Sequence, residues 1–580
     1  MALEEKADDR LKNIVATIQS EQNNIIRADM NKPLIVQGVA GSGKTTIALH
    51  RIAYLIYNCE KEFDPESFMI IAPNKFFLNY ISNVLPDLGV ENVKQYTFED
   101  FAYEIIGKKL KISDSNEKLV TIVNKEFDNI NNGNIKIIIE ESKFKSSMKF
   151  KDIVDKYLKT VEENYIPKED FLLDNVRVFR YENIQKLFMD TYKNLEFDKR
   201  INEVKKHIFS RIKSNKDVIY ETITTKRKAR INNVLKDKSL TDEEKNMKRL
   251  EIFAETEELL KRLNNDDIRI VDDYFKKINK KDCLEYYKDF INNFIYGEVK
   301  DIVLADYLKN NTMNNLNKSE VTFEDLAPII YIHYKVYGTK VKKELRHVII
   351  DEAQDYGEFQ FSVLKTILKS NSMTILGDLA QGVHFYRGIE NWKNFIDVEF
   401  PEGNAVYKTL EKTYRTTKDI MYKANDVINK LPDYEKQYIV EGEPVIDNPD
   451  SIHINKMENA EEIVKECIVR INNYIEKGFK SIAIIGKDIN ECKLIKKYFE
   501  KYNMNIKLIQ SKDSEYNAGL SIVPSYLAKG LEFDSVILFN VNEENYKNNS
   551  LDIKLLYVAI TRAMSKLDIF YTNKISELLN

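Results

Sequence analysis

One stretch constrains this chain more than any other: Ile35 to Ile56, which reads IVQGVAGSGKTTIALHRIAYLI. An apolar, β-branched run leads into a glycine-rich loop, and a segment with helical periodicity follows it. In such a loop the backbone N–H groups can close around phosphates, a lysine neutralises the β and γ phosphates, and a hydroxyl reaches Mg²⁺. The sequence therefore predicts a phosphate-binding loop for a nucleoside triphosphate, formed by Gly38, Gly41, Ser42, Gly43, Lys44 and Thr45.

Two acidic residues follow an apolar run far downstream of this loop. The segment HVIIDEA contains Asp351 and Glu352, and acids at the carboxyl end of a strand are what Mg²⁺-dependent phosphoryl transfer needs. We expect Asp351 to hold Mg²⁺ through water and Glu352 to orient and deprotonate the attacking water. After the next strand, GDLAQ places Gln381 at the γ-phosphate edge, where it can report hydrolysis across the cleft.

Two arginines come from the second half of the chain. Arg415 lies in KTYRTT and Arg562 in YVAITRAMSKL. Charge builds on the γ-phosphoryl oxygens in the transition state, and an arginine from a facing lobe stabilises it. Either arginine alone is more typical of a surface residue, but together with the loop and the acids they indicate hydrolysis.

Short apolar runs bounded by turn residues recur toward both ends of the chain, and each is typical of a buried parallel strand. The first set comprises 33–39, 67–73, 347–353 and 372–378. The second set comprises 451–457, 481–487, 505–511, 519–525, 535–541 and 566–572. Because helix-period segments separate the runs, the sequence predicts an α/β protein with two sheets.

Composition narrows the class of protein. The 580 residues exceed what one hydrophobic core holds and predict two to four domains. A net charge of −4 gives no support for a protein that only grips phosphate backbones. The cysteines at 59, 283, 467 and 492 lack metal-binding spacing, so we expect reduced thiols. There is no apolar run of membrane-spanning length and the first residues are charged, which predicts a cytoplasmic location without membrane attachment.

The middle of the chain, from about Gly107 to Ser319, is rich in Lys, Asn, Glu and Tyr. Its periodicity predicts two helices, roughly 196–236 and 241–264, and we interpret the pair as an antiparallel arm. Thr241 and Glu244 form a capping box that begins the second helix. Basic clusters occur at Lys205, Lys206, Arg211, Lys213, Lys226, Arg227, Lys228 and Arg230. We favour a solvated helix face, and a contact surface for nucleic acid or a partner is the alternative.

The order of the motifs is diagnostic. EQNNIIRA precedes the loop, and DEAQD, GDLAQGVHFYRG, LEKTYRTT, AKGLEFDSVIL and YVAITRAMSKL follow it. This set resembles superfamily 1 helicases of the UvrD/Rep/PcrA group. The resemblance implies two RecA-like P-loop NTPase lobes with ATP and Mg²⁺ between them, and both arginines as finger arginines. It also implies that Gln22 reads the adenine, that Tyr414 stacks on it and that Glu532 lies near the ribose and γ-phosphate. Thr46 stands where many relatives place a nucleotide-contacting arginine.

The resemblance is weaker on the nucleic-acid side. The contacts that it implies with a DNA strand are Asn74, Thr97, Tyr386, Arg387 and Tyr526. Tyr386 and Arg387 match the usual Trp-Arg pair, but Ala72 replaces a phenylalanine that stacks on bases. Glu99 and Tyr526 each replace a histidine. Strand binding depends on aromatic stacking and phosphate contacts, and an acid repels phosphate. The motifs that contact ATP are therefore intact, whereas those that contact the DNA strand are altered.

The position of the insertions also departs from the typical pattern. The interval from Arg415 to Lys529 is short, and the large insertion lies between YTFEDFA and DEAQD. With EEKADDRLKNIVATIQ and FEDLAPIIYIHYKVYG, this architecture is similar to HelD-type factors, which release bacterial RNA polymerase from nucleic acid. It implies a first lobe of 1–106 and 320–395, a helical insertion arm of 107–319 in that lobe, and a second lobe of 396–580. That family has a further N-terminal arm, which we expect to be missing here.

The leading hypothesis is an ATP-hydrolysing motor of the HelD type that remodels complexes of RNA polymerase with nucleic acid. The alternative is a 3′-to-5′ DNA translocase or helicase of the UvrD/Rep type in repair or replication. Altered stacking positions weigh against the alternative. A third hypothesis is an ATP-gated binding module, whose binding would survive the loss of Glu352. A small-molecule kinase would leave two arginines and a second lobe unexplained. We expect a monomer.

Overall fold

The computed structural model describes residues 20–59, 64–107, 110–124, 133–339, 345–370, 372–511, 513 and 519–580. The whole EEKADDRLKNIVATIQ segment lies outside these residues. The chain divides into two compact units, the first of residues 1–150, 301–327 and 341–580 and the second of residues 151–300 and 328–340. Within the described ranges, no helix combines the length and the apolar character that a membrane span requires.

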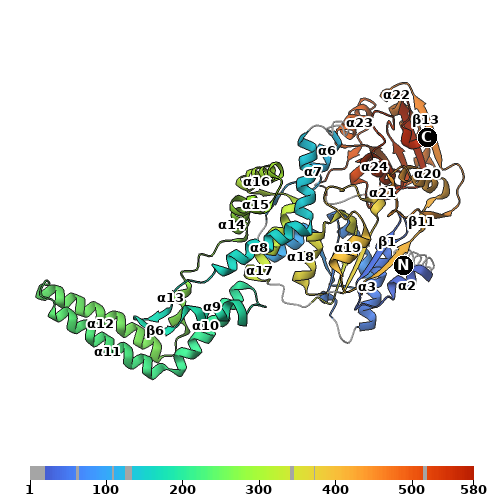
Figure 1. Cartoon of the computed structure of the whole chain (residues 1–580). Coiled ribbons are helices and arrows are strands. Elements are labelled where there is room, and N and C mark those ends of the chain that lie inside the picture. The colour runs from blue at the N-terminus through green and yellow to red at the C-terminus, as the bar shows by residue number, and fades with distance from the viewer. Residues whose placement is uncertain are drawn as a thin grey trace. The chain divides into compact units, whose positions relative to one another are not determined.

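The first unit contains a six-stranded parallel sheet around the phosphate-binding loop (Figure 1). Its strands, in spatial order, are β10 (Val406–Leu410), β1 (Leu34–Gly38), β9 (Met373–Gly377), β8 (His347–Ile350), β2 (Phe68–Ile71) and β3 (Lys94–Tyr96). The helices of this lobe are α3 (Lys44–Cys59), α4 (Lys75–Asp87), α5 (Phe98–Ile106), α18 (Glu358–Leu368) and α19 (Trp392–Glu399). Every residue of β1, β2, β8 and β9 is buried, as in parallel strands covered on both faces.

The four strands predicted for this sheet are confirmed, and the two missed strands lie at its edges. The β3 sequence KQY is only half buried and β10 has an exposed centre, so neither shows the apolar run that identifies a buried strand. Strand β10 pairs in parallel with β1, Leu34 facing Val406. The first sheet therefore extends past the boundary predicted at residue 395.

The same unit contains a second six-stranded parallel sheet. Its order is β13 (Ile452–Met457), β18 (Ala563–Thr572), β17 (Phe533–Leu538), β14 (Ile482–Gly486), β16 (Leu520–Pro524) and β15 (Lys507–Leu508). Helices α20 (Lys418–Ile428), α22 (Ala460–Glu476), α23 (Ile489–Lys501) and α24 (Ser550–Ile560) belong to this lobe. Each of the six predicted runs overlaps a strand. The fold is α/β, with two RecA-like lobes.

Part of the predicted insertion also belongs to the first unit. It comprises α6 (Glu117–Asn124), α7 (Gly133–Ser146), α16 (Ile302–Asn317) and the short parallel pair of β4 (Lys111–Ile112) with β7 (Glu320–Val321). A buried ionic cluster joins these elements. Lys145 contacts Glu141 and Asp325 at 2.8 Å each, and Lys118 contacts Glu141 at 3.3 Å and Glu324 at 3.2 Å. Because each lysine has two acidic partners, the buried charges are compensated.

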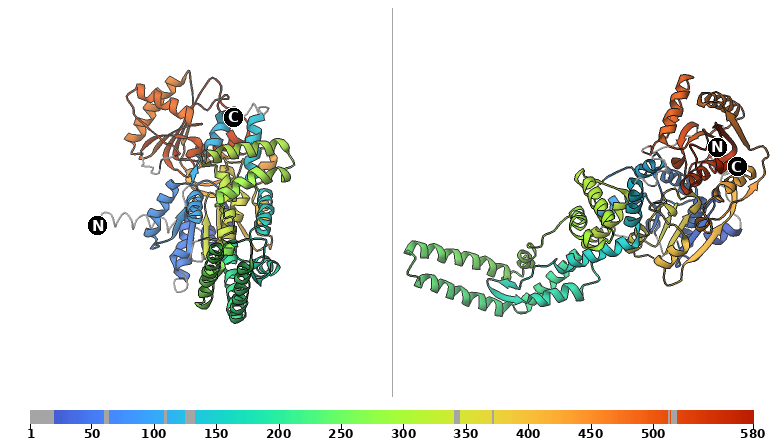
Figure 2. Two further views of the ribbon diagram at one scale, coloured as in Figure 1. Left: turned by 90° about the vertical axis from the view of Figure 1, so that its left-hand side faces the viewer. Right: turned by 45° about the horizontal axis from the view of Figure 1, so that its top comes forward.

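The second unit holds a long antiparallel hairpin of helices α11 (Lys216–Lys236) and α12 (Asp242–Asn264), visible in all three ribbon views (Figures 1 and 2). Thr241 and Glu244 form the predicted capping box at the start of α12. The single helix predicted over 196–236 is wrong. The chain forms α10 (Phe197–Ser214) and α11, separated at Asn215, whose φ of −119° and ψ of 20° are not helical.

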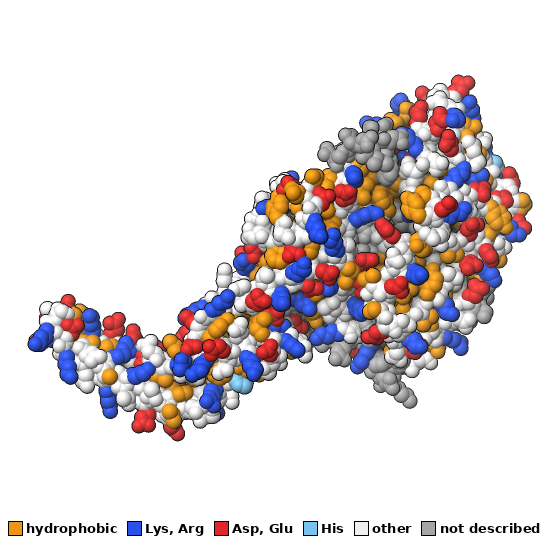
Figure 3. Space-filling model, viewed as in Figure 1, with side chains coloured by type: hydrophobic (Ala, Val, Ile, Leu, Met, Phe, Trp, Pro, Cys, Tyr) orange, Lys and Arg blue, Asp and Glu red, His pale blue; other side chains and the backbone are white. Residues whose placement is uncertain are grey.

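The basic side chains of this unit are interspersed with acidic ones (Figure 3). Lys205 contacts Asp272 at 2.7 Å, and Lys213 contacts Asp266 at 3.2 Å. The arginines follow the same pattern, with Arg227–Glu257 at 3.1 Å and Arg230–Asp174 at 2.8 Å. These ion pairs agree with the favoured interpretation of a solvated helix face.

Candidate functional site

The phosphate-binding loop connects the end of β1 to the start of α3, as its sequence predicts. Glycine is required at Gly38, where a Cβ would lie 2.6 Å from Lys44 Cγ, and at Gly41, whose φ is +74°. A Cβ on Gly41 would also lie 2.4 Å from the Thr413 hydroxyl. The Lys44 ammonium donates to the carbonyls of Gly38 at 2.9 Å and Val39 at 3.0 Å, so it points back into the loop.

The two residues predicted to hold Mg²⁺ lie together. The Thr45 hydroxyl donates to Asp351 Oδ2 at 2.9 Å, joining the start of α3 to the end of β8. Burial and the neighbouring Glu352 carboxylate raise the pKa of Asp351. A hydroxyl and a carboxylate are oxygen donors of the kind that Mg²⁺ takes, with substrate phosphates and water completing its shell. These two side chains therefore fit the ion. No group of three or more His, Cys, Asp or Glu that could hold a metal occurs among the described residues.

Glu352 lies at the start of a short 3₁₀ turn with φ of +51°, in the left-handed region that few side chains adopt. Its carboxylate accepts from the Gln354 amide at 2.7 Å and contacts the Lys529 ammonium at 3.2 Å. Burial alone would raise the pKa of Glu352, but Lys529 and Lys44 outweigh it and lower the pKa. Glu352 is therefore held as the carboxylate, the form that a general base needs.

Lys529 is a site residue that the sequence did not single out, although it lies in the motif AKGLEFDSVIL. It comes from the second lobe, between β16 and β17, and reaches Glu352 and Asp355 of the first lobe, the latter at 2.8 Å. Burial alone would lower its pKa, but Asp355 and Glu352 outweigh that effect and raise it. The lysine thus links the predicted base to the opposite lobe.

The remaining catalytic candidates also meet across the two lobes. Arg562 Nη2 donates to Gln381 Oε1 at 2.8 Å, and Gln381 Nε2 donates to Asp378 at 2.6 Å. Burial and the neighbouring Arg415 lower the pKa of Arg562 to about 10, so it remains a cation at neutral pH. Arg415 pairs with Glu532 and donates to the Thr561 carbonyl at 3.2 Å. The side chains of both arginines are thereby oriented.

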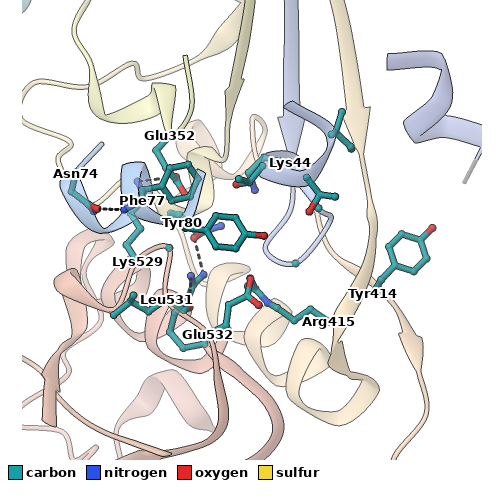
Figure 4. A pocket seen from close by; sticks show the side chains of 18 of the residues that line it. Lys44, Asn74, Phe77, Tyr80, Glu352, Tyr414, Arg415, Lys529, Leu531 and Glu532 are labelled. Carbon is teal, nitrogen blue, oxygen red and sulfur yellow. Dashed lines mark hydrogen bonds and ion pairs between the residues drawn. The ribbon is translucent and has the colours of Figure 1, made fainter. Parts of the chain in front are cut away.

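These groups surround a cavity of about 1010 Å³, shown in Figure 4. The predicted residues that line it are Gln22, Gly41, Gly43, Lys44, Thr45, Thr46, Glu352, Gln381, Tyr414, Arg415, Glu532 and Arg562. Gln22 donates to the Ser42 carbonyl at 3.1 Å. In Figure 4 Lys44 lies on one side of the space and Arg415 and Glu532 on the other. The structure therefore brings the predicted triphosphate residues to one site.

One wall of the cavity is formed by a helix whose residues the sequence did not predict for this site. Helix α4 contributes Phe77 and Tyr80, three residues apart on one helix face. The ring of Tyr80 lies between Lys44 and Glu532 in Figure 4. Asn74, predicted to contact nucleic acid, caps α4 by accepting from the Phe77 N–H at 3.0 Å and also lines this cavity. The helical spacing of polar and aromatic residues in α4 could have indicated this wall of the cavity.

The other four residues predicted to contact nucleic acid are buried. Thr97 caps α5 and donates to Asp100 at 2.9 Å. Tyr386 is 0% exposed and Tyr526 5%, and both belong to one buried cluster with Leu119 and Ile122 of α6. Tyr386 and Tyr526 thus share a buried apolar cluster with two residues of the chain's own insertion.

Arg387 is held by the same region. Its Nη1 donates to the Ser115 carbonyl, just before α6, at 3.2 Å. The same nitrogen lies 3.8 Å from Glu324, and the guanidinium stacks on Phe323 with 4.2 Å to the ring centroid. Nearby, burial raises the pKa of Glu99, against the effect of Arg387. The side chain that matches the family's strand-contacting arginine is thus engaged by residues 115 and 323–324.

Known protein families match both halves of the chain. A family profile described as UvrD/REP helicase N-terminal domain matches residues 18–398, and one described as UvrD-like helicase C-terminal domain matches residues 520–569. The ATP-dependent DNA helicase PcrA of Staphylococcus aureus is 22% identical over 232 residues, 39% of this chain and 29% of that protein. A probable DNA helicase II homolog of Mycoplasma capricolum is 25% identical over 244 residues, 40% of this chain and 30% of that protein.

Two further matches are a helicase and a solved domain. The ATP-dependent DNA helicase Rep of Buchnera aphidicola is 26% identical over 209 residues, 34% of this chain and 31% of that protein. A solved C-terminal domain of a possible DNA helicase from Lactobacillus plantarum is 29% identical, covering 29% of this chain and 92% of that chain with a TM-score of 0.24. The chain spans less than a third of the length of the curated relatives it matches.

Proposed function

Because the chain belongs to the UvrD/REP helicase family, we propose that it is an ATP-hydrolysing motor that moves 3′-to-5′ along single-stranded DNA. The observation that carries the proposal is the hydrogen bond between Gln381 and Arg562. It joins the end of β9 in one lobe to the segment after α24 in the other, at the wall of one cavity. A catalytic cleft assembled from two lobes opens and closes when the lobes move, which is what ATP-driven movement requires.

The nucleotide chemistry follows from the residues at the cleft. Bound Mg²⁺ would neutralise part of the charge that develops on the transferred phosphoryl group. Thr45 and Asp351 would hold it, and Lys44 would exchange the carbonyls of Gly38 and Val39 for phosphate oxygens. The loop that binds the nucleotide therefore already has its lysine inside the site.

Hydrolysis would then use the groups on both sides of the cleft. Glu352, held ionised, accepts a proton from the attacking water. Arg415 and Arg562 stabilise the charge on the γ-phosphoryl oxygens. Gln381, between Arg562 and Asp378, changes partners when the γ-phosphate leaves, and the second lobe responds through Arg562. The proposed motor works in the cytoplasm on DNA during repair or replication.

A second candidate is a HelD-type motor that remodels complexes of RNA polymerase with nucleic acid. The burial of Tyr386, Arg387 and Tyr526 against residues 115–124 favours it, since these side chains are not presented to a strand. It takes second place because the relatives found by comparison are described as DNA helicases. From the sequence alone, the HelD-type motor is the leading hypothesis and the DNA translocase is the alternative.

The test is the ATPase rate of the chain alone, with single-stranded DNA, and with core RNA polymerase. Strong stimulation by DNA supports the translocase. Stimulation by polymerase with little response to DNA supports the second candidate and overturns the first. Binding of either partner that is gated by ATP but unaffected by Glu352→Gln would instead indicate a binding module, because only a motor needs hydrolysis.

A further inference from the structure

Arg51 is a charged residue buried within the first lobe, two turns into α3, the helix that begins with Lys44 and Thr45. Its side chain is 0% exposed. A buried guanidinium is tolerated only when its N–H groups find acceptors, and five donors in a planar fork must be satisfied together. The acceptors of Arg51 therefore show what the residue is placed to hold.

Most of those acceptors belong to one short segment. Nη1 donates to the carbonyls of Ile25 at 2.9 Å, Ile26 at 3.0 Å and Ala28 at 2.8 Å. Nη2 donates to the backbone carbonyl of Asp29 at 3.4 Å, and Nε donates to Thr374 Oγ1 at 2.8 Å. Residues 25 and 26 end helix α2 (Ser20–Ile26), and 28 and 29 follow it. The last carbonyls of a helix lack intrahelical partners, and a cation near them is favoured.

The same short helix presents Gln22 to the phosphate-binding loop. Gln22 Nε2 donates to the Ser42 carbonyl at 3.1 Å, and Gln22 and Ile26, one turn apart, both line the cavity. The position of α2 depends on the tertiary contacts that hold it against α3. Arg51 supplies four of them at one end.

We propose that Arg51 is a positioning residue for base recognition, which holds α2 on α3 so that Gln22 meets the base while Lys44 meets the phosphates. The inference rests on the proposed function, in which the cavity binds ATP with Gln22 on the adenine. One helix then sets the distance between the two recognition groups, because α3 carries both Lys44 and Arg51. A lysine cannot reproduce this hold, since its ammonium is a single point with three donors.

The test uses the whole chain and measures binding of ADP, GDP and inorganic tripolyphosphate by calorimetry. Arg51→Met weakens ADP binding by about tenfold, the equivalent of one lost charge-assisted hydrogen bond. Arg51→Lys weakens it several-fold. In both variants the preference for ADP over GDP falls toward one, and the affinity for tripolyphosphate stays at the wild-type value. Arg27→Met is the matched control, because Arg27 stacks on Tyr54 of α3 at 5.8 Å from outside and is expected to change none of these values.

A double substitution separates positioning from general destabilisation. If Arg51 acts through Gln22, then Gln22→Ala alone removes the ADP preference and adding Arg51→Lys changes it no further. An equal loss of ADP and tripolyphosphate affinity in Arg51→Lys, or a retained preference for ADP, overturns the inference. If Arg51→Met does not fold, Arg51→Lys decides. Failure of the wild-type chain to bind ADP would overturn the proposed function itself. Survival of the wild-type preference for ADP in the Arg51 variants would overturn only the role of Arg51.

Discussion

The nucleotide cleft and the face predicted to contact a DNA strand use the same first lobe but differ in what surrounds their side chains. In the cleft, Glu352 and Gln381 meet Lys529 and Arg562 of the second lobe at the wall of an open cavity. On the other face, Tyr386 packs in a buried cluster with residues of α6. Most of the residues predicted to bind the nucleotide thus line a cavity, whereas four of the five predicted to contact a DNA strand are buried within the chain. Three substitutions test that contrast, and a fourth tests the helical hairpin, which belongs to neither face.

Glu352→Gln has the largest expected effect. Removing the base should lower kcat for ATP by at least about a hundredfold, with little change in KM, because the carboxylate acts in the transition state. Steady-state ATPase assays measure it. Glu399→Gln is the control, since Glu399 is a buried acid of α19 in the same lobe. A Glu352→Gln enzyme with more than a tenth of wild-type kcat would contradict the assignment.

Leu119→Ala tests the other face. Leu119 is fully buried in the cluster that includes Tyr386, and truncating a buried leucine costs about 2–5 kcal/mol. We expect the loosened α6 to release Tyr386, so that single-stranded DNA stimulates the ATPase more strongly than in wild type while KM for ATP is unchanged.

Ile471→Ala is the control for that experiment, because Ile471 is equally buried in α22 of the second lobe but belongs to a different buried cluster. Denaturant unfolding should show a comparable loss of stability for both variants. Equal stimulation of the ATPase by single-stranded DNA in the two variants would show that α6 does not restrict the binding of DNA.

Lys529→Met should act through pH. Lys529 lowers the pKa of Glu352, so its removal raises that pKa. Glu352 must be ionised to act as a base, and activity at the acid end of the profile is therefore lost at a higher pH than in wild type. We expect the acid limb of kcat/KM to move up by about one pH unit. Lys487→Met, which removes a lysine paired with Asp552 at 2.7 Å in the second lobe, should leave the limb in place.

Thr241→Ala has the smallest expected effect and bears on neither face. Loss of the capping box should destabilise α12 by about 1 kcal/mol, seen as faster amide exchange in its first turn, with the ATPase rate unchanged. Ser239→Ala alters a nearby turn hydroxyl bound to Asp237 at 2.6 Å and should spare α12. A change in ATPase rate in Thr241→Ala alone would reveal a link between the hairpin and the cleft.

Local pattern was sufficient for much of the molecule. The apolar run before Gly38 became β1, the acids at Asp351 and Glu352 follow β8, and Thr241 begins α12, because strands, loops and caps depend on residues a few positions apart. Local pattern failed where the signal was weak. Edge strand β10 is exposed along its centre, and no proline or glycine within 196–236 marks the break at Asn215.

The sequence by itself determined that this chain has a phosphate-binding loop, two parallel sheets and the residue types of a site for ATP hydrolysis. Only the tertiary structure decided which distant groups meet. Gln381 is 181 residues from Arg562 in the chain, and the sequence around either residue does not indicate the hydrogen bond between them. The packing of α6 with Tyr386 and the hold of Arg51 on α2 depend in the same way on segments far apart in the chain. Local preferences act over one or two turns, whereas these contacts exist only once the whole core has packed.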